Sequence, residues 1–133
     1  MARRRKWAIG GATVVALLLV TAALAWYVAV PNWRPPLRDG ETYGIDVASH
    51  QGDIDWPTVA DDNISFAYIK ATEGGDFTDQ QFARNWRQAE AVGLDRGAYH
   101  FFTLCTSGAA QARHFLATVP ADDDALAPAV DLE

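Results

Sequence analysis

Hydrophobic and polar residues follow two different patterns along this chain. Residues 7–30 carry no charged side chain, whereas the sequence after residue 42 alternates short apolar runs with amphipathic segments. The short runs are rich in β-branched and aromatic residues, which is typical of buried strands. They predict strands over residues 43–48, 64–71, 97–102 and 127–133.

Two segments between the predicted strands place apolar residues at helical spacing. Residues 79–92 carry Phe82 and Trp86 four positions apart, and residues 107–119 begin with Ser107, a favourable N-cap. Strand, helix, strand and helix in this order are the pattern of βα units. The pattern therefore predicts a parallel sheet covered by helices.

Unusual polar residues stand at or near the carboxyl ends of the predicted strands. They are Asp46, Lys70, Glu73, His100, Asp131 and Glu133. Barrels of alternating strands and helices build their active sites at that end. A closed barrel needs roughly 200 residues or more, and only about 91 follow Thr42. The predicted fold class is α/β, the N-terminal half of a modified TIM-like barrel over residues 43–133, preceded by an N-terminal transmembrane helix.

The start of the chain predicts membrane attachment. Residues 1–6 carry four basic side chains, and the 24 uncharged positions of residues 7–30 exceed the roughly 20 that a helix needs to cross a bilayer. The basic cluster favours a cytoplasmic N-terminus, so residues 7–30 are predicted to be a single-pass signal anchor and residues 31–42 a proline-rich linker. The alternative is a secretory signal cleaved near residues 23–25. Both interpretations place the rest of the chain outside the cell membrane.

The charge of the chain limits its partners. From Arg34 onward there are seven basic and 17 acidic residues, a formal charge of −10. Such a surface argues against binding to nucleic acid. The single cysteine, Cys105, excludes an internal disulfide and a cysteine-based zinc site, and the three histidines have no metal-binding spacing. We expect no metal or organic cofactor, and nothing in the sequence indicates an oligomeric state.

The end of the chain places two acids on one strand. Asp131 and Glu133 are two positions apart, so in a strand both would face the same side, with Cα atoms roughly 6.5 Å apart. A carboxylic acid near other carboxylates keeps its proton more readily, and glycoside hydrolysis needs a protonated acid beside the leaving oxygen. Glu133 is therefore the candidate general acid, Asp131 a stabilising carboxylate and Asp46, expected on a neighbouring strand, a third acid.

Four segments in this order resemble glycoside hydrolase family 25, the lysozymes that cleave peptidoglycan. The segments are residues 44–52, 66–74, 97–101 and 130–133. The resemblance covers about residues 43 to 133. One departure is Ala48, where the family usually has serine.

The resemblance implies an activity and roles for individual residues. It implies hydrolysis of the β-1,4 bond between N-acetylmuramic acid and N-acetylglucosamine, with peptidoglycan glycan strands as the partner. Glu133 matches the family's acid, Asp131 the carboxylate that positions the acetamido group, and Asp46 the first-strand acid. Lys70 and Tyr99 fall on positions that line the sugar groove.

Three further interpretations stay open at this point. His100, at the end of the third strand, is a candidate for hydrogen bonding within the groove. Another hydrolase with an Asp-x-Glu strand, such as a chitin-type enzyme, fits the same pair of acids. A truncated, inactive wall-binding fragment is the interpretation without catalysis.

Overall fold

The computed structural model describes residues 2–30 and 33–132, with the backbone alone for residues 2–13. It divides into two compact units, Met1–Pro36 and Leu37–Glu133. The boundary falls inside the predicted proline-rich linker.

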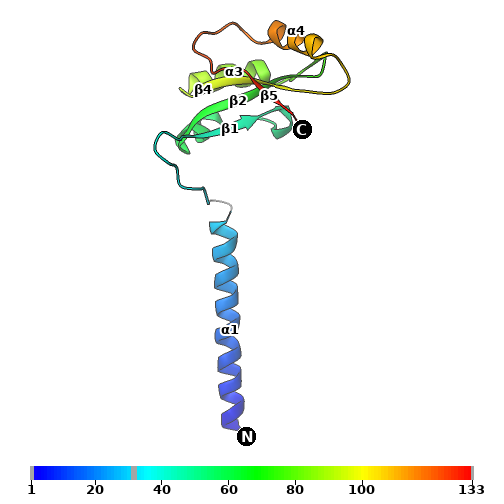
Figure 1. Cartoon of the computed structure of the whole chain (residues 1–133). Coiled ribbons are helices and arrows are strands. Elements are labelled where there is room, and N and C mark those ends of the chain that lie inside the picture. The colour runs from blue at the N-terminus through cyan, green and yellow to red at the C-terminus, as the bar shows by residue number, and fades with distance from the viewer. Residues whose placement is uncertain (1, 31–32, 133) are drawn as a thin grey trace. The chain divides into compact units, whose positions relative to one another are not determined.

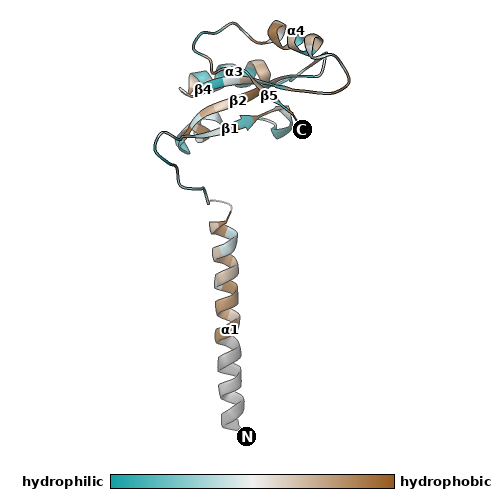
Figure 2. Ribbon diagram, viewed as in Figure 1, coloured by the Kyte–Doolittle hydropathy of each residue, from teal (hydrophilic) through white to brown (hydrophobic). Residues whose placement is uncertain are grey.

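The described residues of the first unit contain one long helix. Helix α1 spans Ala2–Ala29, and its residues from Val14 onward are mostly apolar (Figure 2). Their side chains are exposed. Among the residues that the structure describes, no helix combines the length and the apolar character needed to cross a membrane. The transmembrane anchor over residues 7–30 therefore stays a prediction from the sequence.

The second unit is built on a sheet in which four strands run parallel (Figure 1). The strands lie in the order β1-β2-β4-β5, and a short strand, β3, pairs antiparallel with β2. Their bounds are Tyr43–Val47 for β1, Ile64–Glu73 for β2, Phe77–Thr78 for β3, Asp95–Phe101 for β4 and Ala129–Asp131 for β5. The four predicted strands and their parallel arrangement are confirmed, and β3 was not predicted.

Helices follow the strands as the βα pattern predicted. Their bounds are Ser49–Gln51 for the 3₁₀ turn η1, Trp56–Asp61 for α2, Phe82–Ala91 for α3 and Gly108–Thr118 for α4. Ser107 caps α4, because its side chain accepts a hydrogen bond from the backbone N–H of Ala110 at 3.3 Å. Helix α3 begins three residues later than predicted, because Asp79 still pairs with the sheet through its N–H to the carbonyl of Ala71.

One face of the sheet, here called the helix face, is packed. Strand β2 alternates, so that Ala67 and Ile69 are fully buried against Trp56, Trp86 and other apolar side chains of the core. Each Å² of apolar surface buried stabilises a fold by about 25 cal/mol. The apolar surface buried on this face therefore provides most of the stability of the unit.

The opposite face, here called the open face, carries larger and less buried side chains. Phe66 and Tyr68 of β2 meet there edge to face, with ring centroids 6.2 Å apart, and both are half-buried. Their rings need glycines on the adjacent strands. A Cβ atom at Gly44 would lie 2.2 Å from the ring of Phe66, and one at Gly97 would lie 2.4 Å from the ring of Tyr68.

Candidate active site

Side chains from all four parallel strands line one hollow on the open face. Its volume is about 370 Å³, and it is lined by Asp46 of β1, Tyr68 of β2, Tyr99 of β4, and Ala129, Val130 and Asp131 of β5. Asp46 and Asp131 lie near the carboxyl ends of their strands, where the sequence predicted them. The structure thus brings together two of the three predicted acids and the predicted groove residue Tyr99.

The position of Asp46 corrects one expectation. We expected its strand to neighbour that of Asp131, but β2 and β4 lie between them. Each βα crossover adds the next parallel strand beyond the previous one, so the first and last strands become the two edges of this sheet. Because residues of both edge strands line one hollow, the sheet must curve toward its open face, as a segment of a barrel does.

The two acids differ in their surroundings. Asp46 is exposed and Asp131 half-buried. Asp131 has a fixed backbone, because its carbonyl accepts a hydrogen bond from the N–H of Phe102 at 2.9 Å and its Cα pairs with that of Phe101. Glu133, the predicted general acid, lies outside the described residues.

Tyr68 is a lining residue that the sequence analysis did not single out. Its hydroxyl donates a hydrogen bond to the carbonyl of Ala127 at 2.9 Å, which ties β2 to the segment before β5 across the intervening strand β4. The signal was present in the sequence: Tyr68 lies two positions before Lys70 and so faces the same side of the strand.

Lys70 lies on the open face beyond Tyr68 but does not line the hollow. Its ammonium group is 2.6 Å from Glu73 Oε2, and it lies over the ring of Phe101 at 4.7 Å. The register of β2 against β4 shifts between Lys70 and Thr72. This irregularity turns Glu73 to the same side as Lys70, so these two residues, which were predicted to lie at the end of the strand, form an ion pair.

His100 lies away from the hollow. It is 5% exposed and sits on the helix face, where its ring nitrogens contact Thr72 Oγ1 at 2.8 Å and Gln111 Oε1 at 2.9 Å. Side chains alternate along a strand, so Tyr99 on the open face requires His100 to point to the other side. The structure therefore does not place His100 where it could bind a sugar in this hollow.

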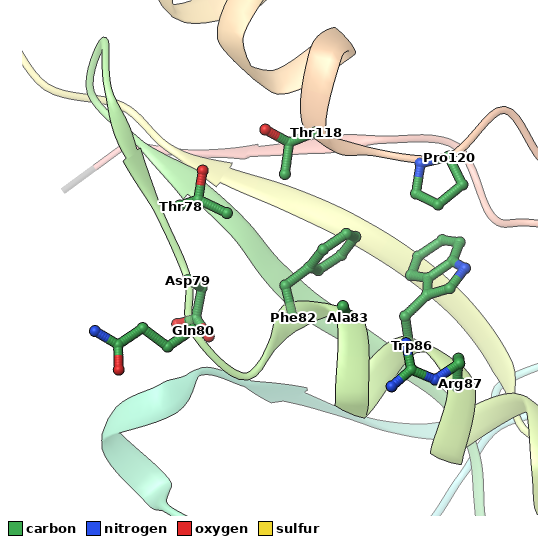
Figure 3. Close-up of a pocket in the computed structure, with 9 residues that line it drawn as sticks. All are labelled: Thr78, Asp79, Gln80, Phe82, Ala83, Trp86, Arg87, Thr118 and Pro120. Carbon is green, nitrogen blue, oxygen red and sulfur yellow. The ribbon is translucent and has the colours of Figure 1, made fainter.

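A larger hollow, of about 590 Å³, lies on the helix side (Figure 3). Figure 3 shows Phe82 and Trp86 on α3 and Thr118 and Pro120 at the end of α4. Asp79 is the single acid among the described residues that line it, and its two carboxylate oxygens accept hydrogen bonds from the N–H groups of Ser49 and Gln81 at 2.8 and 2.9 Å. This hollow lacks the paired acids that hydrolysis needs.

Metal binding has no support in the described part of the chain. There, no group of three or more His, Cys, Asp and Glu side chains is arranged to hold an ion. The chemistry available in the hollow on the open face is that of carboxylates and tyrosines, which suits acid catalysis and the packing of aromatic rings against sugars.

A curved parallel sheet with acids converging at the carboxyl ends of its strands defines the class: an α/β protein of the barrel-enzyme type, represented by four strands. Comparison with known proteins gives the family. The family model described as "Glycosyl hydrolases family 25" matches residues 45–133. The chain belongs to this family.

Individual relatives agree with this assignment. The chain is 46% identical over 81 residues to "Lysozyme M1" of Streptomyces globisporus, covering 60% of this chain and 28% of the relative. It is 35% identical over 103 residues to "N,O-diacetylmuramidase" of Arthroderma benhamiae, covering 77% of this chain and 44% of the relative. It is also 45% identical over 96 residues to "Uncharacterized protein YegX" of Escherichia coli (strain K12), covering 68% of this chain and 35% of the relative.

A solved structure supports the same fold. "The Structure of a family 25 Glycosyl hydrolase from Bacillus anthracis" matches with a TM-score of 0.69 and 43% identity, covering 76% of this chain and 47% of that chain. This chain therefore spans less than half the length of the relatives it matches, which agrees with the prediction of a partial barrel.

Proposed function

We propose that this chain supplies the N-terminal half of a lysozyme-type catalytic domain that hydrolyses the β-1,4 bond between N-acetylmuramic acid and N-acetylglucosamine in peptidoglycan. The observation that carries the proposal is the presence of Asp46 and Asp131, from the two edge strands of the sheet, in one hollow with two tyrosines. The relatives named as a lysozyme and an N,O-diacetylmuramidase support the substrate class.

The proposed roles follow from the chemistry of glycoside cleavage. Glu133 donates a proton to the leaving oxygen, and the positive charge that develops on the sugar needs a nearby carboxylate or the substrate's own acetamido group. Asp131, two positions before Glu133, holds that acetamido group. Asp46, exposed on the far side of the hollow, adds negative charge that favours the developing cation and keeps the proton on Glu133.

The tyrosines and Lys70 define the proposed path of the glycan. The rings of Tyr68 and Tyr99 offer apolar surface against which a sugar ring packs. Lys70 follows Tyr68 on the same face, so a glycan that extends beyond the hollow reaches the Lys70–Glu73 ion pair. His100 is not part of this proposal, because it lies on the helix face.

Product analysis tests the proposal and separates it from its alternatives. The purified full chain is incubated with peptidoglycan and with chitin, and soluble products are identified by mass spectrometry after reduction. Because all three acids with proposed roles belong to this half of the domain, muropeptides that end in reduced N-acetylmuramic acid are the expected result. Chitin oligomers would indicate a chitin-type enzyme. Sedimentation of the chain with peptidoglycan without any product would indicate a wall-binding protein and contradict hydrolysis by this chain.

The proposed location is the outer face of the cell membrane. Residues 1–6 would lie in the cytoplasm and residues 7–30 would anchor the chain, supported by the four basic side chains and the 24 uncharged positions of the sequence. Secretion after signal cleavage is the alternative. Membrane fractionation with N-terminal sequencing decides between them: an intact N-terminus in the membrane fraction supports the anchor, and a soluble product that begins after residue 25 contradicts it.

A further inference from the structure

Three buried polar side chains on the helix face, the side of the sheet opposite the candidate site, are linked by hydrogen bonds. Thr72 of β2, His100 of β4 and Gln111 of α4 are 0%, 5% and 1% exposed. Thr72 Oγ1 lies 2.8 Å from His100 Nδ1, and His100 Nε2 lies 2.9 Å from Gln111 Oε1. Three elements are thus joined by hydrogen bonds through one histidine ring.

The contacts of Gln111 determine the direction of these hydrogen bonds. Its Nε2 donates to the carbonyls of Thr103 and Thr106 at 2.7 and 2.9 Å, and its Oε1 accepts from the N–H of Thr103 at 3.1 Å. Reversing the amide would face two carbonyls with an oxygen and the N–H of Thr103 with a donor. The amide oxygen therefore faces His100, so His100 Nε2 must donate to it, and in the neutral ring Nδ1 is then the acceptor for the hydroxyl of Thr72.

Gln111 contacts the residues on either side of the two that hold Asp131 in place. Gln111 bonds to His100 and to Thr103, and the two residues between them pair with Asp131: Phe101 in register, and Phe102 through its N–H to the carbonyl of Asp131 at 2.9 Å. Strand β5 is three residues long, so this pairing is a large share of what fixes its end. The carbonyl of Phe101 also accepts from the N–H of Gly74, which follows Glu73.

We propose that Gln111 is a positioning residue for Asp131: by clamping Thr103 and Thr106 and fixing the Nε2–H form of His100, it holds the end of β4 against which Asp131 is placed. Within the described residues, Gln111 is not part of the lining of the hollow and forms no hydrogen bond with Asp46 or Asp131. The relevance of this placement to hydrolysis rests on the proposed function, but the placement itself does not.

The alternative is that Gln111 only satisfies the loop carbonyls and stabilises the unit as any buried side chain does. That role predicts that substitution lowers global stability and leaves the end of β4 no more mobile than the rest of the sheet. A comparison with a core substitution of similar global effect separates the two. Leu94→Ala is suitable, because Leu94 is buried in the core and directly precedes the opposite end of β4.

The first measurement needs no substitution. Side-chain ¹⁵N NMR of the full chain distinguishes the two neutral forms of a histidine. The proposal requires a protonated Nε2 and an unprotonated Nδ1 for His100. An Nδ1–H form would overturn it, because Gln111 would then not hold the ring as described.

The second measurement is native-state hydrogen exchange at the backbone N–H of Phe102 in Gln111→Met and Gln111→Glu. The loss of about one net hydrogen bond predicts about tenfold faster exchange at Phe102 than in Leu94→Ala at matched global stability. Equal exchange in the Gln111 and Leu94 variants would overturn the proposal. If Gln111→Met does not fold, Gln111→Glu, which retains an acceptor for His100 but loses both donors, provides the test.

The measurements distinguish failure of the proposed hydrolysis from failure of the positioning role of Gln111. If the chain releases no product from peptidoglycan yet Phe102 exchange and the His100 form are as predicted, the positioning of Asp131 stands and hydrolysis by this chain falls. If hydrolysis is found and Phe102 exchange matches the Leu94 control, hydrolysis by this chain stands and the positioning role of Gln111 falls.

Discussion

The ammonium group of Lys70 lies 2.6 Å from the carboxylate of Glu73, three residues further along the same strand. In a regular strand, residues three apart face opposite sides of the sheet. The shift in register between Lys70 and Thr72 removes this difference and turns both side chains to the open face. A local irregularity in β2 therefore forms a charge pair beside the candidate site.

A double-mutant cycle with Lys70→Met and Glu73→Gln tests this pair. Lys70 is 14% exposed and Glu73 is 40% exposed, so we expect a coupling free energy of about 0.5–1 kcal/mol, near the upper end for a partly exposed pair. Urea unfolding of the four proteins measures it. A coupling indistinguishable from zero would show that the two groups do not interact in solution.

Gly97→Ala is expected to destabilise the second unit. The new Cβ would lie 2.4 Å from the ring of Tyr68, which is held by its hydroxyl on Ala127, so the ring cannot simply turn away. Overpacking of this kind costs roughly 1–3 kcal/mol. Gly108→Ala is the matched control, because its Cβ would lie 3.8 Å from Phe102 at the first residue of α4 and should be neutral or stabilising. Equal unfolding midpoints for the two variants would contradict the packing described.

Asp79→Ala is expected to loosen the segment that follows Asp46. The buried carboxylate of Asp79 accepts from the N–H of Ser49, three residues beyond Asp46, and from the N–H of Gln81. Leaving these donors without a partner costs roughly 1–3 kcal/mol. Asp76→Ala, at an exposed position before β3, should change stability by less than about 0.5 kcal/mol. Chemical denaturation of both variants checks the difference, and similar losses would count against the contact with Ser49.

Acid sensitivity provides a further prediction. The hydrogen bond from Arg96 at 2.7 Å, together with the backbone N–H of Asp124, holds the pKa of Asp122 below its usual value of 3.8. Because the folded pKa is lowered, this contribution to stability is present above the ordinary pKa and is lost as the pH falls through the folded pKa. Asp122→Asn should therefore show a shallower fall in unfolding free energy below about pH 4 than the unsubstituted chain.

The exposed Asp123→Asn is the control for this prediction. It removes a neighbouring carboxyl without removing the bond to Arg96, so the acid dependence should stay as in the unsubstituted chain. If Asp122→Asn and Asp123→Asn gave the same profile in urea titrations over that range, the role assigned to Arg96 would be wrong.

The sequence predicted the framework of the fold well. Short apolar runs that alternate with amphipathic segments located β1, β2, β4 and β5, because strands buried by helices must be apolar. Ser107 identified the start of α4. Strand β3 could not be predicted, because two residues carry no periodic pattern and their structure depends on pairing with β2. The register shift near Ala71 is likewise a property of two strands together.

The candidate site was predicted in part. The positions of Asp46 and Asp131 at strand ends followed from local pattern, but their meeting across two intervening strands depends on the curvature of the sheet, which no single segment encodes. His100 could have been excluded from the groove on the sequence alone. Tyr99 and His100 are adjacent on one strand and cannot both face the groove, so strand alternation alone assigns one of them to the helix face.

The central claim is that residues of both edge strands form one sugar-binding hollow. It is tested most directly by an NMR titration of the full chain with the disaccharide of N-acetylglucosamine and N-acetylmuramic acid. We expect the backbone amide signals of Asp46, Tyr99 and Asp131 to shift together with one dissociation constant, since all three line the same hollow. Shifts confined to one edge strand, or to the hollow beside Phe82 and Trp86, would contradict it.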